Sequence, residues 1–230
     1  MTNLINFVIF LGSLGIDGEN VLYLQTELIL KADNYSDFYI NRVLKANNGV
    51  YQILKRLSDA DRIRAEILSF YDNLIANSDE TDKVLYTEFK ESTLNQILSI
   101  SSPWFRSFLA FDPRPILEKT NIPILGLWGS NDLQVPAAQN YDEMKKALEK
   151  ANNNNFNLTI LKGLNHLFQN STTGNIDEYE KIEETFSVEA LNLMSEWICY
   201  NYVNSSILKC IASTSLLILA NLMYFMTTSF

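Results

Sequence analysis

Histidine is almost absent from this chain, because His166 is the only one among 230 residues. The chain also has only two cysteines, Cys199 and Cys210. One imidazole and two thiols near one end are too few for a zinc-type centre, so we expect neither a metal nor a cofactor. They are also too few for a disulfide framework. The interpretation we favour for both cysteines is two small apolar residues on helices.

Positive charge is also scarce, with 18 Lys and Arg against 27 Asp and Glu and a net charge of −9. This balance argues against nucleic acid as a partner, because binding to phosphate backbones needs a basic surface. No Lys or Arg precedes Lys31 and the apolar run at residues 7–11 is short, so we expect no secretory signal peptide. With 47% hydrophobic residues, the chain is predicted to fold around one substantial core, or one core with an appendage.

Three short apolar runs have the character of buried strands. Residues 7–11 precede the glycine-rich turn Gly-Ser-Leu-Gly, residues 122–128 precede a polar turn, and residues 156–161 follow an asparagine tract. Pro136 suits the first position of a helix after the second run, and Ser187 suits the cap of a helix after the third. Strand and helix in alternation with short links predict parallel β-α units.

Residues 19–110 show helical spacing throughout, with no strand between the helices. Ser36 is placed to start one of these helices, and the tetrapeptide Ser58-Asp-Ala-Asp61 fits a capping box at the start of another. Several consecutive helices set between strands predict an inserted lid or cap.

Two polar residues follow the second and third predicted strands. Asp132 lies in Trp-Gly-Ser-Asn-Asp-Leu and His166 in Gly-Leu-Asn-His-Leu-Phe. Carboxyl ends of neighbouring parallel strands lie about 5 Å apart, so an acid and an imidazole there come within hydrogen-bond reach. Such an Asp orients the imidazole, which then removes a proton from a hydroxyl nucleophile. Taken singly, Asp132 also suits a turn-capping aspartate and His166 an ordinary structural histidine.

These segments resemble a known family. The motifs are Asn121-Ile-Pro-Ile-Leu-Gly-Leu-Trp-Gly-Ser-Asn-Asp132-Leu-Gln-Val-Pro, Leu161-Lys-Gly-Leu-Asn-His166-Leu-Phe-Gln and Ser102-Pro-Trp-Phe-Arg-Ser-Phe-Leu-Ala-Phe-Asp-Pro. They are similar to the C-terminal part of α/β-hydrolase-fold serine hydrolases, especially bacterial esterases related to the prolyl-oligopeptidase (dienelactone-hydrolase-like) group. The likeness covers about residues 5–199 and is most specific around Asp132 and His166.

The resemblance implies an α/β class chain with a partial α/β-hydrolase fold of about three parallel strands. It divides the chain into an interior strand and turn (1–18), a helical lid (19–110), a core with Asp132 and His166 (111–200) and an apolar tail (201–230). It also implies hydrolysis of a small carboxylic ester or acyl substrate through an acyl-enzyme. Aromatic residues of the lid are then candidates for the acyl pocket, although plain core is the commoner role at such spacing: Trp104, Phe105 and Phe108.

The family's nucleophile is missing from the expected place. The serine lies in a Gly-x-Ser-x-Gly elbow upstream of the acid, and no such pentapeptide precedes Asp132. Ser13 is a weak substitute, because Leu11 occupies the position where the elbow needs glycine. We therefore expect the chain alone to be inactive, with a serine supplied upstream or by a partner chain at the exposed edge of the first strand. The alternative is a non-catalytic remnant that binds a ligand or partner.

The C-terminal segment is unusually apolar, with no charged residue from Cys210 to Phe230. Residues 207–226 are long enough for a helix that spans a bilayer, which would make the chain a C-terminally anchored protein. Ser213, Thr214 and Asn221 weaken that interpretation. The competing one is an extra amphipathic or buried helix on a cytoplasmic protein.

Overall fold

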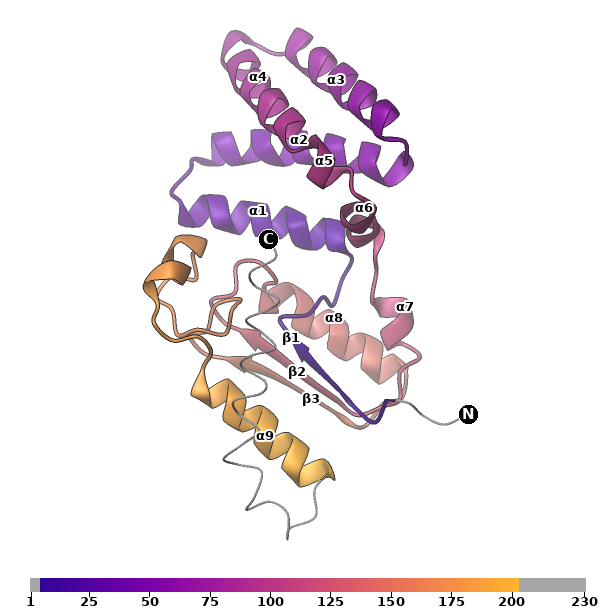
Figure 1. Ribbon diagram of the computed structural model, residues 1–230, viewed down its shortest axis with the longest axis vertical. Helices are drawn as coiled ribbons and strands as arrows, with labels where there is room; N and C mark the ends of the chain where they lie inside the picture. Colours follow the sequence, from indigo (N-terminus) through magenta and orange to yellow (C-terminus); the bar gives the residue numbers. More distant parts are fainter. Residues whose placement is uncertain (1–4, 203–230) are drawn as a thin grey trace. The chain divides into compact units, whose positions relative to one another are not determined.

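A computed structural model describes residues 5–202 of the chain. The chain forms two compact units. Among the described residues, the sheet unit comprises residues 5–13 and 117–202, and the helical unit comprises Leu14–Ile116. In Figure 1 the helical unit contains α1 to α6, and the sheet unit contains the three strands with α8 and α9.

The sheet unit has a three-stranded parallel sheet in the order β1-β2-β3. Its strands are β1 (Val8–Leu11), β2 (Ile124–Gly129) and β3 (Phe156–Leu161). Val8 is opposite Ile124, which in turn is opposite Phe156. Every residue of the central strand is buried, as expected for a strand covered on both faces. The prediction of an α/β chain with three parallel strands is confirmed.

Helices cover both faces of this sheet. On one face, Ala190 and Met194 of α9 (Val188–Tyr202) share a buried apolar cluster with Leu125 and Leu127. On the other, Trp128 meets Tyr141 of α8 (Ala137–Lys150) edge to face at 5.8 Å. Side chains alternate across a strand, so the odd and even positions of β2 supply two separate interfaces. A 3-10 helix, η1 (Ile176–Lys181), lies between β3 and α9 in the sequence.

The start of α8 differs by one residue from the prediction. Pro136 has φ −60° and ψ 130°, so it is the cap and Ala137 is the first helical residue. Ser187 immediately precedes α9, in the cap position expected from the sequence.

The helical unit contains α1 (Gly18–Ala32), α2 (Asp37–Arg56), α3 (Ala60–Ala76), α4 (Glu80–Asn95), α5 (Ile97–Ile100) and α6 (Pro103–Ala110). Short polar side chains cap five of them, accepting from the backbone N–H three residues on: Asp17, Ser36, Asp59, Asp79 and Ser102. The predicted capping box is wrong by one residue, because Asp59 rather than Ser58 caps α3 and accepts from Arg62 N at 2.9 Å. The carboxylate of Asp59 also suits the positive end of the helix dipole.

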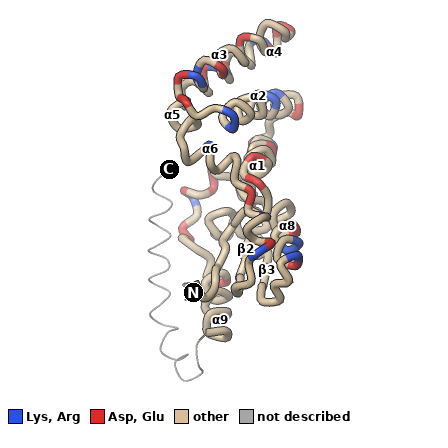
Figure 2. Tube along the Cα trace, turned by 90° about the vertical axis from the view of Figure 1, so that its right-hand side faces the viewer, with Lys and Arg blue, Asp and Glu red and all other residues tan. Residues whose placement is uncertain are grey.

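The hydrophobic core of the helical unit is formed by residues of that unit. The apolar faces of α2, α3 and α4 close around fully buried Ile63 and Ile67, with Leu54 and Tyr86 beside them. Figure 2 shows acidic and basic residues intermixed along α2 to α4 and α8. α7 (Arg114–Leu117) lies at the C-terminal end of this unit in the sequence and precedes β2.

The predicted apolar helix or membrane anchor at residues 207–226 lies outside the described residues. Within residues 5–202, no helix combines the length and hydropathy needed to cross a bilayer.

Candidate active site

Asp132 is held by the turn that follows β2. One carboxylate oxygen, Oδ1, accepts hydrogen bonds from the backbone N–H groups of Gln134 and Val135, each at 2.8 Å. The other, Oδ2, lies 2.9 Å from Nδ1 of His166. The Asp132 side chain is 0% exposed, so its charge is withdrawn from water and satisfied by these three partners. The carboxylate can therefore neither rotate away nor pair with solvent.

His166 lies in the loop after β3, at the same end of the sheet as Asp132. Its side chain is 28% exposed, so the imidazole is anchored on the buried carboxylate at Nδ1 and accessible elsewhere. Within residues 5–202, Asp132 is the only side chain hydrogen-bonded to the His166 imidazole ring. With the ring proton on Nδ1, the carboxylate accepts from Nδ1–H and the Nε2 lone pair can take a proton from a substrate or nucleophile. The two side chains lie within hydrogen-bond distance, as expected from their places after neighbouring strands, and their catalytic role stays a prediction.

Buried amides give the histidine loop its shape. Asn165 and Gln169 are buried and bind each other reciprocally: Asn165 Nδ2 donates to Gln169 Oε1 at 2.9 Å, and Gln169 N donates to Asn165 Oδ1 at 3.0 Å. Phe168 takes a left-handed φ of 58° and stacks on Phe186 at 5.3 Å. These contacts fix the backbone on both sides of His166.

The acid loop and the histidine loop are tied directly to each other. Asn131 N donates to Leu164 O at 2.9 Å, and Gly163 N donates to Ser130 Oγ at 2.8 Å. Asn131 Nδ2 also donates to Ser171 O at 3.1 Å. Hydrogen bonds on either side of the pair hold the Asp132 to His166 distance without relying on the pair itself.

Gly12 is a site residue that the sequence did not single out as such. It follows β1 with φ +51°, and a Cβ built on it would lie 3.2 Å from His166 Cε1 and Nδ1 and 3.3 Å from Asp132 Oδ2. Gly12 N donates to Leu127 O at 2.8 Å, which fixes the turn against β2. The recognisable signal is a glycine at the carboxyl end of a strand that neighbours the acid-bearing strand. Only glycine fits without crowding the pair.

Tyr179 is a second residue that was missed. Its hydroxyl lies 2.8 Å from Gln134 Nε2, beside the turn that holds Asp132. Burial, with a smaller contribution from the Asp132 charge, raises the pKa of Tyr179 above its ordinary value. The phenol therefore stays neutral and can both donate and accept. Nothing in the local sequence marks this residue, because η1 is brought to the site by the fold of the loop.

The other predicted site residues are Ser13 in the sheet unit and three aromatic residues in the helical unit. Ser13 follows Gly12, and its backbone carbonyl accepts from Trp128 Nε1 at 2.9 Å, but across residues 5–202 its hydroxyl makes no hydrogen bond to His166. Trp104 is 62% exposed and stacks on Phe108 at 5.6 Å, whereas Phe105 packs against the helical core. The acyl-pocket role of these three aromatic residues stays a prediction.

Among the described residues, no three His, Cys, Asp or Glu side chains gather closely enough to hold a metal ion. Comparison with known proteins adds no identity, since no family model, curated protein or solved structure matches the chain. The geometry of the Asp132 and His166 pair is therefore the basis for a functional assignment.

Proposed function

We propose that Asp132 and His166 are the orienting acid and the general base of a serine hydrolase that cleaves carboxylic esters through an acyl-enzyme. The observation that carries this proposal is the 2.9 Å contact between Asp132 Oδ2 and His166 Nδ1, with the carboxylate fully buried and the imidazole partly exposed. A histidine with a purely structural role on a turn would not need a buried carboxylate whose two oxygens are both held by hydrogen bonds. The likeness to α/β-hydrolase-fold esterases around both residues supports the same assignment.

The chemistry follows from the atoms that each group offers. His166 Nε2 takes the proton of a serine hydroxyl as the serine oxygen attacks the ester carbonyl carbon. The imidazolium then gives that proton to the leaving alcohol as the C–O bond breaks, which leaves an acyl-enzyme. A water molecule, deprotonated by the same Nε2, then attacks the acyl carbon, and the imidazolium returns that proton to the serine oxygen as the bond to the acyl group breaks and the acid product leaves. Asp132 stays ionised throughout and stabilises the imidazolium.

The nucleophile is the part of this proposal that residues 5–202 do not supply. Ser13 lacks a hydrogen bond to His166, and within that range no other serine makes one. The proposal therefore assigns the serine to a segment outside these residues or to a partner chain beside edge strand β1. In the same proposal the helical unit keeps the lid role that the resemblance implies for residues 19–110.

A fluorophosphonate probe tests this assignment, because it labels only serines activated by a neighbouring base. We expect the natural gene product, isolated from its source with an antibody against this chain, to be labelled. A D132N variant should lose most labelling, and H166Q should lose it entirely. Absence of labelling in the natural product contradicts the proposal.

The 230-residue chain on its own provides a separate comparison. We expect no labelling of it. Labelling that disappears in S13A would reassign the nucleophile to Ser13 and restore activity to the single chain.

The second candidate is a non-catalytic protein that binds a small ligand or a partner. It is favoured by the lack of any serine bonded to His166 within residues 5–202. In that case H166Q should leave every measurable property of the natural product unchanged. The associated idea of a membrane tether concerns residues 207–226, outside the described residues.

A further inference from the structure

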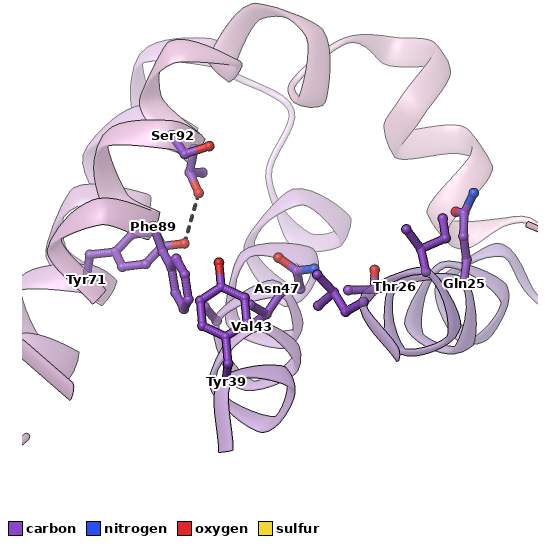
Figure 3. Close-up of a pocket in the computed structure, with 12 residues that line it drawn as sticks. Gln25, Thr26, Tyr39, Val43, Asn47, Tyr71, Phe89 and Ser92 are labelled. Atoms are coloured by element: carbon purple, nitrogen blue, oxygen red, sulfur yellow. Dashed lines mark hydrogen bonds between the residues drawn. The ribbon is translucent and has the colours of Figure 1, made fainter. Parts of the chain in front are cut away.

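The helical unit contains a cavity of about 410 Å³ that no part of the proposed hydrolase chemistry uses. Every residue that lines it belongs to Leu14–Ile116, from helices α1, α2, α3 and α4. Figure 3 shows side chains from these helices around the hollow, with Tyr39, Phe89 and Tyr71 near one another and Gln25 and Thr26 on α1. Cavities of roughly 300–1,000 Å³ are the size at which proteins bind small molecules.

Short side chains at helix-facing positions create this hollow. On α2 the lining residues Tyr39, Val43, Ala46 and Asn47 form one helical stripe, and Ala46 is only 1% exposed. The α4 helix contributes the exposed Ser92 and the partly buried Thr93, whose short side chains leave the space open. The hollow is open to solvent, since Ser92 at its border is exposed, so a ligand can enter it from water.

The lining combines aromatic, aliphatic and uncharged polar side chains. Phe89 meets Tyr39 edge to face at 5.6 Å, and Tyr39 stacks on Tyr35 at 4.6 Å, so the aromatic wall is braced from behind. Tyr71 and Thr93 hold their hydroxyl oxygens 2.9 Å apart at the cavity. None of the twelve lining residues is an acid or a base.

The hydroxyl groups of this wall stay neutral. Burial raises the pKa of Tyr71, although the hydrogen bond to Thr93 works against this, and burial also raises the pKa of Tyr39. The wall therefore offers phenol and aliphatic hydroxyls and an amide side chain, Asn47, to a ligand. An ionised ligand would lose its water here without meeting a counter-charge, which is costly.

We propose that this cavity binds an uncharged aromatic molecule that carries a carbonyl or hydroxyl group, with the ring against Tyr39 and Phe89 and the polar group toward the Tyr71 and Thr93 hydroxyls. The site lies within one unit and does not depend on Asp132 or His166. The cavity proposal can therefore be tested independently of the hydrolase proposal.

A neutral, environment-sensitive fluorophore, 6-propionyl-2-dimethylaminonaphthalene, tests the site with the full chain. It has the required ring system and a carbonyl acceptor, and its emission shifts to the blue when it leaves water. We expect saturable binding to the unmodified chain. S92W should fill the cavity and weaken binding about tenfold or more, since it removes the space for the ring. S69W, at an exposed serine of α3 that is not part of the lining, is the matched control and should bind as the unmodified chain does.

A charge in the wall provides a second comparison that needs no change of volume. N47D places a carboxylate at the cavity and should weaken dye binding about fivefold. N48D adds the same charge at the next, exposed position and should have no effect. This pair decides the matter if circular dichroism shows that S92W is unfolded.

H166A should bind the dye as the unmodified chain does, because the site is independent of the hydrolase pair. Two results would overturn the proposal: no saturable binding to the unmodified chain, or affinities in S92W and N47D equal to those of their controls.

Discussion

Replacing Gly12 by alanine is expected to perturb the Asp132 and His166 pair from a position that makes no hydrogen bond to either side chain. The new Cβ would lie 3.2 Å from two atoms of the His166 ring and 3.3 Å from Asp132 Oδ2. Contacts this close require the neighbours to move by a few tenths of an ångström. Gly163→Ala is the matched control, because Gly163 also has a left-handed φ, +78°, but a Cβ there meets nothing within 4 Å.

The two substitutions share one cost and differ in another. A left-handed alanine costs roughly 1–2 kcal/mol, which is the loss expected for Gly163→Ala. Gly12→Ala adds strain on a charge-assisted hydrogen bond, a bond whose full loss is worth about 1.5–3 kcal/mol, so its total should reach about 2–4 kcal/mol. Urea unfolding followed by circular dichroism measures both values. Nitrogen-15 spectra of the single histidine report the pair directly.

We expect the His166 ring signals to shift in Gly12→Ala and to stay near their original positions in Gly163→Ala. The reasoning is refuted if Gly12→Ala costs no more stability than Gly163→Ala and leaves those signals unchanged.

The remaining predictions concern the surroundings of the pair and the two cores. Tyr179→Phe removes the hydroxyl that meets Gln134 Nε2, so the natural product should lose hydrolytic rate but keep its fold, whereas Tyr200→Phe at a surface position should change neither. Burial raises the pKa of Tyr51 to about 12, so the free energy of unfolding should fall by about 2–3 kcal/mol as pH rises from about 10 to 12. In Tyr51→Phe the urea unfolding midpoint should change less with pH over that range. Burial opposes ionisation of Glu178, but hydrogen bonds from the backbone N–H groups of Thr173 and Gly174 outweigh it and lower the pKa of Glu178. The stability that this carboxylate gives its loop should therefore be lost only as pH falls below the ordinary titration range of a glutamate. Amide exchange in residues 172–178 measures this loss, and Glu178→Gln should show the acid behaviour already at neutral pH. Leu127→Ala should cost about 2–5 kcal/mol in urea unfolding, since Leu127 is fully buried in the central strand.

The strands and the proximity of Asp132 and His166 were predictable because their signals are local. Each apolar run is short and ends in a turn, and Asp132 and His166 follow two strands that pair directly in the sheet. Parallel pairing then brings the two side chains together without further information. The same local signals placed the starts of α2 at Ser36 and of α9 after Ser187.

The parts that could not be predicted depend on contacts distant in the sequence. Gly12 belongs to the site only because β1 pairs beside β2 and ends level with the pair. Tyr179 reaches Gln134 because of how residues 170–187 fold back, which no periodicity encodes. Ser58 and Asp59 both suit the N-cap of α3, so the sequence does not fix which of them precedes the first helical residue.

The central claim is that Asp132 holds His166 as a base with Nε2 free, and the tautomer of this one histidine tests it most directly. Because the chain has a single histidine, a long-range nitrogen-15 spectrum of the neutral imidazole needs no assignment. The predicted result is a protonated Nδ1 and an unprotonated Nε2, with the preference lost in D132N, since an amide can donate as well as accept. A protonated Nε2, or a spectrum that D132N does not change, would contradict the account.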